Sequence, residues 1–559
     1  MAHRTFGLGL LAAATTAAVT LVWPGPPPAQ AALAPAESPN IVYVVLDDFS
    51  SNLLPYMSEV ERLAGEAVAF DNFFVTDSQC CPSRASTLTG MYPHNSGVLT
   101  NGWRQGGFEQ FMERHLDSSL STQISAAGYR TGYVGKFLNG YRPDGSRGDG
   151  DRGQPVHPAG FVPPGWDEWH VAGDGYGQFD YTVAEAIDAD VADVVRYGHQ
   201  EDDYHTDVMT KTAVEFLDRA VGSDGTVDQP FFLTLAPFAV HSRIGKSELK
   251  GEPVFPAAPR DRADPTKTPW PNRWGERESS SGDCGEIVGG CDAVVFPDPA
   301  DADVFNDLPE NAPRWMGKKA LGIKTVADMR ELHLDRIRMA QSINDLLREV
   351  RLQLDALDLA DSTYIVFTSD NGYHLGEHGL TRGKNSMFDH DIRVPLFVVP
   401  PGGVSPRTVS AFSQNTDLLP TFLDLAGSTA TGTDGRSLVP LLDGDPTSRW
   451  RDAALVEFTR GSVKGDPDRQ PHGKTPTYRG VRTLEYIYVD YSLLVDEPSA
   501  GQAEFYDLVR DPAATINQFD ALSAQQRAAL DRALDAYASC AGEACTAAGR
   551  SMPDITTRR

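Results

Sequence analysis

Positive charge is in short supply in this chain. Its 559 residues include 77 acidic and 49 basic side chains, which gives a formal net charge of −28 at pH 7. Nucleic-acid-binding proteins normally present a basic face to the phosphates, so this balance argues against nucleic acid as a partner. An anionic substrate would have to be held by a few cations inside a pocket, because the overall charge does not attract it.

Long apolar runs are lacking after residue 23. The run over residues 6–23 follows a positively charged start and precedes Ala29-Gln30-Ala31, which is the order of a secretory signal peptide. We predict a signal peptide over residues 1–31 and a Pro- and Ala-rich leader over 32–39; an uncleaved anchor is the alternative. No later segment is apolar for long enough to span a bilayer. The expected product is secreted and extracellular, without stable membrane association.

Cysteine is also scarce, with six residues. Two pairs, Cys284 with Cys291 and Cys540 with Cys545, each close a short loop, and we expect both to form disulfides in an oxidising compartment. Cys80 and Cys81 remain, and neighbouring thiols do not easily pair with each other. A structural zinc site is the competing account, but the chain has no Cys-x-x-Cys pair to support it.

The remaining two cysteines stand at the start of a predicted helix. Pro82 fits the first turn of a helix and Gly90 fits its C-terminal end. Cys80 is then expected just ahead of the helix N-terminus, where backbone N–H groups favour an anion. Arg84, one turn later, would add a positive fork for a tetrahedral oxyanion. A helix start with a buried cysteine pair is the alternative.

Alternating strands and helices predict the fold class. Apolar segments typical of strands buried on both faces alternate with segments that have apolar residues at helical spacing. We therefore predict an α/β fold, in which helices sandwich a large mixed, mostly parallel sheet. The predicted strands lie at 40–46, within 128–136, and at 230–236, 362–368 and 394–399, and the predicted helices at 206–220 and 329–357.

The texture of the sequence changes twice along the chain. Residues 242–318 are rich in Pro, Gly and charge, and are too long for a plain connection, so we predict a functional loop or insertion. After residue 445, short strands and then a polar helix predict a smaller α+β domain with an antiparallel sheet. We place the large domain at 40–445 and the smaller domain at 446–559. The strands expected there are 453–458, 478–482 and 486–491, and the helix is 523–539.

Acidic side chains follow two of the predicted buried strands. Asp47 and Asp48 come directly after one strand, and Asp370 and Asn371 come after another. Open α/β sheets place their sites beyond such strand ends, so both pairs can reach one site. Three carboxylates and an amide oxygen suit calcium better than zinc or copper. Either pair alone would be an ordinary turn sequence.

Together these residues resemble the sequence pattern of a known protein family. The string Cys80-x-Pro82-Ser83-Arg84, followed by Leu-Thr-Gly90, resembles the signature of the sulfatase family, in which the first cysteine is oxidised to Cα-formylglycine (3-oxoalanine). The resemblance covers nearly all of the chain after the leader and implies the alkaline-phosphatase-like fold. Further segments look most like the N-acetylglucosamine-6-sulfatase and heparan endosulfatase branch: residues 92–95, 128–131, 165–169, 204–207 and 369–374. Residues 504–508 and 511–512 resemble the usual C-terminal motif of sulfatases.

The resemblance implies roles for individual residues. Asp47, Asp48, Asp370 and Asn371 would bind one calcium ion, and the modified Cys80 would complete its shell. Arg84, Lys136 and Lys384 would hold the sulfate, and His241 would protonate or orient the leaving group.

One position departs from the family pattern. Many sulfatases carry a histidine two residues after the first lysine, whereas this chain has Leu138, with Asn139 next. The base that collapses the sulfated intermediate is therefore open. His374 is one candidate for that base; His374 and Asn139 are also candidates for substrate contacts.

The function implied by the resemblance is hydrolysis of sulfate monoesters by a formylglycine nucleophile and a divalent metal. The expected substrates are sulfated sugars, chiefly 6-O-sulfated N-acetylglucosamine, and aryl sulfates, and a formylglycine-generating enzyme would be a transient partner. Trp166 and Trp169 could offer faces to a sugar ring, with packing in the core as the alternative. Two other functions stay open: a phosphonate monoester or phosphodiester hydrolase of the same superfamily, and an inactive secreted glycan-binding protein.

Overall fold

A computed structural model describes most of the chain. The described residues are 38–102, 105–146, 157–222, 227–243, 253–261, 284, 287, 290–317, 319–445, 450–459, 475–491 and 503–555. The predicted signal peptide, and the predicted leader up to residue 37, lie outside them. None of the helices in the described part combines the length and apolar character that crossing a bilayer would need.

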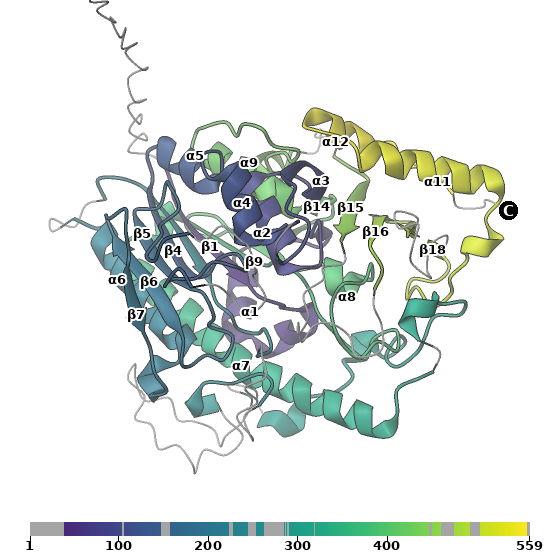
Figure 1. Ribbon diagram of the computed structural model, residues 1–559, viewed down its shortest axis with the longest axis horizontal. Helices are drawn as coiled ribbons and strands as arrows, with labels where there is room; N and C mark the ends of the chain where they lie inside the picture. Colours follow the sequence, from purple (N-terminus) through teal and green to yellow (C-terminus); the bar gives the residue numbers. More distant parts are fainter. Residues whose placement is uncertain are drawn as a thin grey trace, which may run out of the picture.

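A ten-stranded sheet forms the centre of the molecule (Figure 1). Its inner strands β9, β1, β8, β4 and β5 are parallel neighbours, whereas β12, β6 and β7 pair antiparallel. The predicted mixed, mostly parallel sheet is therefore confirmed. In spatial order the strands are β13 (Arg407–Val409), β2 (Val68–Phe70), β12 (Leu396–Val399), β9 (Thr363–Ser369), β1 (Asn40–Leu46), β8 (Phe231–Ala236), β4 (Arg130–Lys136), β5 (Glu168–Ala172), β6 (Thr182–Ile187) and β7 (Asp193–Arg196).

Helices cover both faces of this sheet, as predicted. The pleat of β1 directs alternate side chains to opposite faces, and every residue of the strand is buried. Val42 and Val44 pack in one core with α1 (Ser58–Ala64), α6 (His205–Ala220) and α7 (Ile323–Ala356). Ile41 and Tyr43 pack in the other core with α2 (Cys80–Thr89), α4 (Gly107–His115), α5 (Leu120–Ala126) and α9 (Leu418–Leu425).

A second sheet follows in the chain. Its four antiparallel strands are β15 (Ala453–Phe458), β16 (Tyr478–Thr483), β17 (Tyr486–Asp490) and β18 (Ala503–Asp507), accompanied by α11 (Ala524–Tyr537) and α12 (Glu543–Ala548) (Figure 1). The predicted smaller antiparallel sheet is confirmed, and β18 is an additional strand. The domain boundary at 445/446 stays a prediction. Short elements complete the chain: β3 (Phe73–Phe74), β10 (His374–Leu375), β11 (Arg382–Gly383), β14 (Ser413–Gln414), α3 (Pro93–Ser96), α8 (Asp389–Ile392) and α10 (Val439–Leu442).

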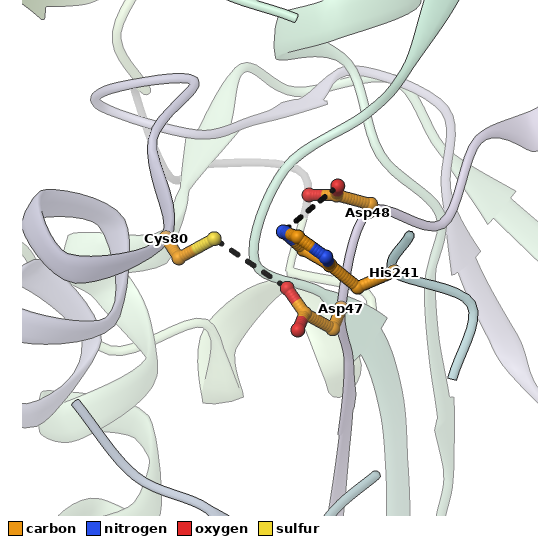
Figure 2. Close-up of side chains that lie close together, drawn as sticks. All are labelled: Asp47, Asp48, Cys80 and His241. Atoms are coloured by element: carbon orange, nitrogen blue, oxygen red, sulfur yellow. Dashed lines mark hydrogen bonds and ion pairs between the residues drawn. The ribbon is translucent and has the colours of Figure 1, made fainter. Parts of the chain in front are cut away.

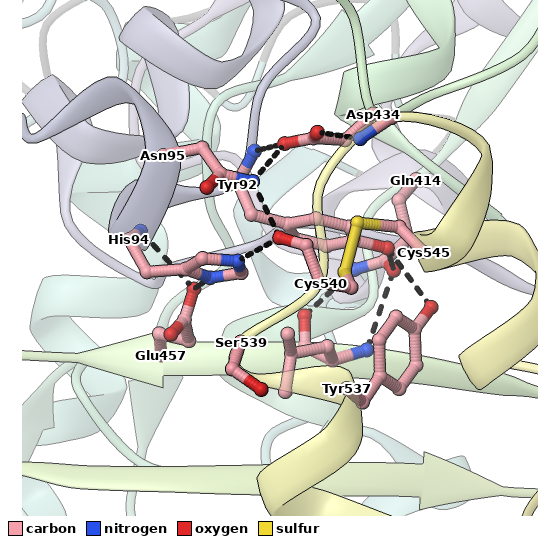
Figure 3. The surroundings of a disulfide bond; sticks show 12 residues. Tyr92, His94, Asn95, Gln414, Asp434, Glu457, Tyr537, Ser539, Cys540 and Cys545 are labelled. Carbon is pink, nitrogen blue, oxygen red and sulfur yellow. Dashed lines mark hydrogen bonds and ion pairs between the residues drawn. A yellow bond between two sulfur atoms is a disulfide. The ribbon is translucent and has the colours of Figure 1, made fainter.

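Both predicted disulfides are present, and the one between Cys540 and Cys545 lies at a contact between distant segments. Figure 3 shows the backbone carbonyl of Cys540 facing His94 and Asn95, which belong to the short helix after α2. His94 Nε2 donates to that carbonyl (2.9 Å), and Asn95 Nδ2 donates to it as well (2.8 Å). His94 Nδ1 lies 2.7 Å from Glu457 Oε2. Helix α3 is thus hydrogen-bonded to the turn between α11 and α12 and to Glu457 of β15.

His94 lies between two hydrogen-bond acceptors, Glu457 and the Cys540 carbonyl, and we therefore predict that the free energy of unfolding depends on the protonation of His94. Burial alone would lower the pKa of His94, but the hydrogen bond and charge of Glu457 outweigh it and raise that pKa. A raised folded-state pKa stabilises the protein fully below the unfolded value of about 6.5, and the effect is lost as the pH rises through the folded value. We expect His94→Gln to lower the Tm by about 2 °C near pH 5 and by less at higher pH.

Thermal melting of both proteins across a pH series measures this difference. His199→Gln is the matched control, because His199 also pairs with a carboxylate, Asp180, but its side chain is 44% exposed. A Tm difference for His94→Gln that stays constant with pH would contradict the prediction.

Candidate active site

The predicted metal ligands lie at one edge of the large sheet. β1 and β9 are paired so that Leu46 lies beside Ser369, and the residues after both strands therefore meet. The Asp48 backbone N–H donates to Asp370 Oδ1 (3.2 Å), and Asn371 Nδ2 donates to Asp48 Oδ1 (2.7 Å). Asp47, Asp48, Asp370 and Asn371 are all buried. The structure thus brings together the four predicted ligands.

Asp48 has a backbone conformation that few side chains adopt. Its φ is 58°, in the left-handed region that favours glycine. Arg336 of α7, which is fully buried, donates through Nη2 to the Asp48 carbonyl and through Nη1 to Ser50 Oγ (3.0 Å). Its guanidinium also lies 4.4 Å from the ring centroid of Tyr373. Arg336, which the sequence did not single out, therefore holds the turn that presents Asp48.

Helix α2 brings Cys80 to this edge. The helix begins at Cys80, with Gln79 as its N-cap, so Cys80 lies in the first turn and not ahead of it as predicted. Gly90 ends the helix in the left-handed conformation (φ 69°), as expected for a glycine there. Cys80 Sγ lies 3.5 Å from Asp47 Oδ1 and 3.0 Å from Lys384 Nζ. In Figure 2 the thiol points from the helix start toward Asp47, and His241 lies beside Asp48.

The three predicted cations each meet a carboxylate. Arg84 Nε donates to Asp370 Oδ2 (2.7 Å), Lys136 Nζ donates to Asp47 Oδ2 (2.6 Å), and Lys384 Nζ donates to Asp48 Oδ1. Lys384 Nζ also lies 3.4 Å from Asn371 Oδ1. Lys136 and Lys384 are only 2% and 1% exposed.

Charge in the cluster is balanced. Arg84, Lys136 and Lys384 match the formal charges of Asp47, Asp48 and Asp370, so a divalent cation would turn the site net positive toward an anion. Arg84 Nη2 is buried and has no hydrogen-bond partner among the described residues. Burial raises the pKa of the Cys80 thiol, although Lys136 and Lys384 act in the opposite direction.

His241 approaches from the loop after β8. Its Nδ1 donates to the Ser242 carbonyl (2.6 Å), since a carbonyl oxygen only accepts, and its Nε2 lies 3.5 Å from Asp48 Oδ2. The imidazole therefore presents Nε2 to the metal-ligand cluster.

The two candidate substrate residues have protein partners. Asn139 Nδ2 donates to the hydroxyl of Tyr176 (3.2 Å), and the Cys81 thiol donates to Asn139 Oδ1 (3.4 Å). His374 Nδ1 lies 2.8 Å from Asp391 Oδ1, and β10 places His374 opposite Gly383, next to Lys384. The roles of Asn139 and His374 stay predictions.

The tryptophans proposed for sugar binding are part of the core instead. Trp169 is fully buried and Trp166 is 7% exposed, and both pack in the core on the α2 side of the sheet. Trp169 Nε1 donates to the Tyr141 hydroxyl (2.8 Å). The hypothesis that their faces bind a sugar is wrong, because neighbouring aromatic rings cover them.

The cluster fits a hard divalent cation. Asp47, Asp48, Cys80 and His241 each offer a ligand atom, and these atoms lie within 4.8 Å of one another. Asp48 Oδ2 is buried and accepts no hydrogen bond in the described part of the chain, which leaves it available to a metal. With Asp370 and Asn371 adjacent, the donor set is mostly oxygen, as calcium prefers.

The large mixed sheet between two layers of helices, followed by a small antiparallel sheet, is an alkaline-phosphatase-like fold. Comparison with known families then identifies the particular family. The sequence model of the family described as "Sulfatase" matches residues 39–428. A second, "N-sulphoglucosamine sulphohydrolase, C-terminal", matches residues 376–537. The chain belongs to the sulfatase family, which confirms the resemblance seen in the sequence.

Related proteins agree with this assignment. The chain is 27% identical over 540 residues to the N-acetylglucosamine-6-sulfatase of Homo sapiens, an alignment that covers 91% of this chain and 86% of that one. It is 29% identical over 435 residues to the extracellular sulfatase SULF-1 homolog of Drosophila melanogaster, covering 75% of this chain. The chain spans 33% of the length of that relative, and 52% of the Caenorhabditis elegans Sulf-1 homolog.

Solved structures show the same fold. BT4656, in complex with its substrate D-glucosamine-2-N,6-O-disulfate, has a TM-score of 0.60 at 21% identity, covering 89% of this chain and 97% of that one. The phosphonate monoester hydrolase of Silicibacter pomeroyi has a TM-score of 0.58 at 19% identity, covering 88% and 93%. Since both structures share the fold, the fold alone does not separate sulfate from phosphonate esters.

Proposed function

We propose that this protein is a secreted enzyme that hydrolyses sulfate monoesters, with Cys80 converted to formylglycine and one calcium ion at the adjacent carboxylates. The observation that carries the proposal is the position of Cys80. Its Sγ lies at a helix N-terminus within 3.5 Å of Asp47 and 3.0 Å of Lys384. Secretion is supported by the two disulfides and by the signal-like start of the sequence.

Asp47, Asp48, Asp370 and Asn371 would hold the calcium ion, which supplies Lewis acidity toward a sulfuryl oxygen when bound. Conversion of Cys80 would place an oxygen nucleophile where Sγ lies. Asn371, by donating to Asp48, keeps the Asp48 carboxylate turned into the site.

The remaining side chains act on the substrate. Arg84, Lys136 and Lys384 would stabilise the charge on the sulfuryl oxygens during transfer, since all three are buried and fixed by ion pairs. His241 would donate a proton from Nε2 to the departing oxygen, while its Nδ1 stays bound to Ser242.

For the substrate, we propose a 6-O-sulfated N-acetylglucosamine at a chain end or in a short oligosaccharide, with additional activity on aryl sulfates. Support comes from similarity to the human N-acetylglucosamine-6-sulfatase over 91% of this chain. The net charge of −28 disfavours long polyanionic tracts. Phosphonate monoester hydrolysis is the second candidate, because a hydrolase of that class shares the fold.

A substrate panel tests this function. We expect the kcat/KM for N-acetylglucosamine-6-sulfate and for an aryl sulfate to exceed that for a phosphonate monoester by at least about tenfold. Cys80→Ala protein, purified in parallel, controls for contaminating enzymes. A higher kcat/KM for the phosphonate would refute the sulfatase activity, and reaction of aryl sulfates alone would refute the sugar substrate. Binding of sulfated oligosaccharides without turnover of any ester would favour the glycan-binding alternative.

A further inference from the structure

Tyr176, in the segment between β5 and β6, contacts several of the predicted active-site residues. Its ring centroid lies 4.7 Å from that of His241, with an interplanar angle of 56°, and 5.0 Å from Lys136 Nζ. Its hydroxyl accepts a hydrogen bond from Asn139 Nδ2 (3.2 Å). The side chain is 6% exposed, so these contacts are made in a closed environment.

The backbone that carries Tyr176 is itself fixed. Gly175 packs directly on Phe238, because a Cβ added at Gly175 would lie 2.7 Å from the Phe238 ring. The Tyr176 ring meets Phe238 edge-on, with centroids 4.7 Å apart. Phe238 is also joined to His241, since the His241 N–H donates to the Phe238 carbonyl (2.8 Å). Tyr176, Phe238 and His241 therefore pack together as one unit.

Of its two neighbours Lys136 and His241, we expect His241 to depend more on the Tyr176 ring. Lys136 is anchored by its ion pair with Asp47 at 2.6 Å, and the cation–π contact at 5.0 Å adds to that anchoring. The His241 hydrogen bond to Ser242 fixes the position of Nδ1, and Nε2 lies 3.5 Å from Asp48 Oδ2. The Tyr176 ring packs against the imidazole at a tilt of 56°, so removing it would open space into which the imidazole could turn, which would carry Nε2 away from Asp48.

We propose that Tyr176 is a positioning residue that aims His241 Nε2 at the leaving-group oxygen. This inference rests on the proposed function, in which His241 donates the proton to that oxygen. Protonation matters most for leaving groups that are strongly basic and least for activated ones. Tyr176 therefore determines how well the enzyme hydrolyses esters of poor leaving groups, such as sugar alcohols, and has little influence on activated aryl sulfates.

The test is a series of aryl sulfates whose phenols span a wide range of pKa, together with N-acetylglucosamine-6-sulfate. We expect Tyr176→Leu to lower kcat about 100-fold for the poorest leaving group and about threefold or less for the most activated one, with KM little changed. The dependence of kcat on leaving-group pKa thus becomes steeper. Tyr176→Phe keeps the ring and is expected to restore the wild-type slope, whereas His241→Ala should steepen it at least as much as Tyr176→Leu.

Tyr197→Leu is the matched control, because it removes a tyrosine ring that stacks on Tyr181 (5.1 Å) and should leave the slope unchanged. A uniform loss of kcat for all substrates in Tyr176→Leu would overturn the proposal, and so would a steeper slope in Tyr176→Phe. Should Tyr176→Leu fail to fold, Gly175→Ala takes its place, since the added Cβ would lie 2.7 Å from the Phe238 ring and displace the ring against which Tyr176 packs. Wild-type protein with converted Cys80 that hydrolyses no sulfate ester would instead overturn the proposed function, and this role with it.

Discussion

Replacing Cys80 by alanine is expected to abolish sulfate ester hydrolysis, lowering kcat by at least about 10⁴-fold. The reason lies in what surrounds Cys80 Sγ. It is within 3.5 Å of Asp47 Oδ1 and 3.0 Å of Lys384 Nζ, at the start of a buried helix, so in the proposed function the atom attached there would face the ester. Alanine removes that atom and leaves the ion pairs of Arg84 and Lys136 in place.

Cys81→Ala is the matched control for this result. The Cys81 thiol donates to Asn139 instead of meeting the carboxylates, and burial, with the neighbouring Cys80, raises its pKa. We expect Cys81 to stay an unconverted thiol, because only Cys80 stands two residues before Pro82. We expect Cys81→Ala to retain activity per converted Cys80 within about tenfold. Mass spectrometry of the tryptic peptide ending at Arg84 should find an aldehyde at position 80 and a thiol at position 81. Fully active protein with an unmodified thiol at position 80 would disprove the role of Cys80.

The centre of the fold could be predicted from the sequence because its strands are buried on both faces. β1 and β9 read as continuous apolar runs, and their position in the middle of the sheet follows from that composition. The outer strands on both sides were not predicted: β5, β6 and β7 on one side, and β2 and β13 on the other. β7 is largely exposed and its residues alternate little, so it becomes a strand only by pairing with β6.

Part of the candidate site could also be predicted, because two pairs of its residues directly follow buried strands. Two acidic pairs that each follow a buried strand can project from one sheet edge into one site, which physical reasoning alone could show, but only the structure shows that β1 and β9 are neighbours. Lys136 and Lys384 came only from the resemblance to sulfatases, because an isolated lysine is normally a surface charge. In the structure Lys136 and Lys384 are only 2% and 1% exposed, so neither is a surface charge.

Two supporting residues were missed because their roles depend on tertiary contacts. Tyr176 reaches His241 only through the packing of its loop on Phe238, which leaves no pattern in the sequence. For Arg336, in contrast, the sequence does contain an indication of a buried role. It stands at helical spacing with the buried residues His333, Ala340 and Ile343 of α7, and a charge in the apolar stripe of a helix indicates a buried partner.

The second large effect is expected from Asp370→Asn. Asparagine keeps the size of the side chain but removes one of the three carboxylates in the cluster, so we expect the bound calcium to fall well below one per chain and kcat to drop by at least about 10³-fold. The substitution also weakens the ion pair with Arg84 Nε at 2.7 Å, which holds that guanidinium in the site. Elemental analysis of the purified protein, alongside the activity assay, measures both losses.

Asp417→Asn is the matched control for Asp370→Asn, because it breaks a buried ion pair without removing a predicted metal ligand. Asp417 is fully buried and pairs with both terminal nitrogens of Arg451, at 2.7 and 2.8 Å, outside the cluster of metal ligands. Breaking that pair should lower the Tm, because it leaves a buried guanidinium without its carboxylate, but calcium content should stay at one per chain. Excess calcium should restore part of the activity of Asp370→Asn and none of the stability of Asp417→Asn. Active wild-type protein that contains no divalent metal would rule out the calcium site, and Asp370→Asn protein that keeps a full equivalent of calcium would remove Asp370 from the ligand set.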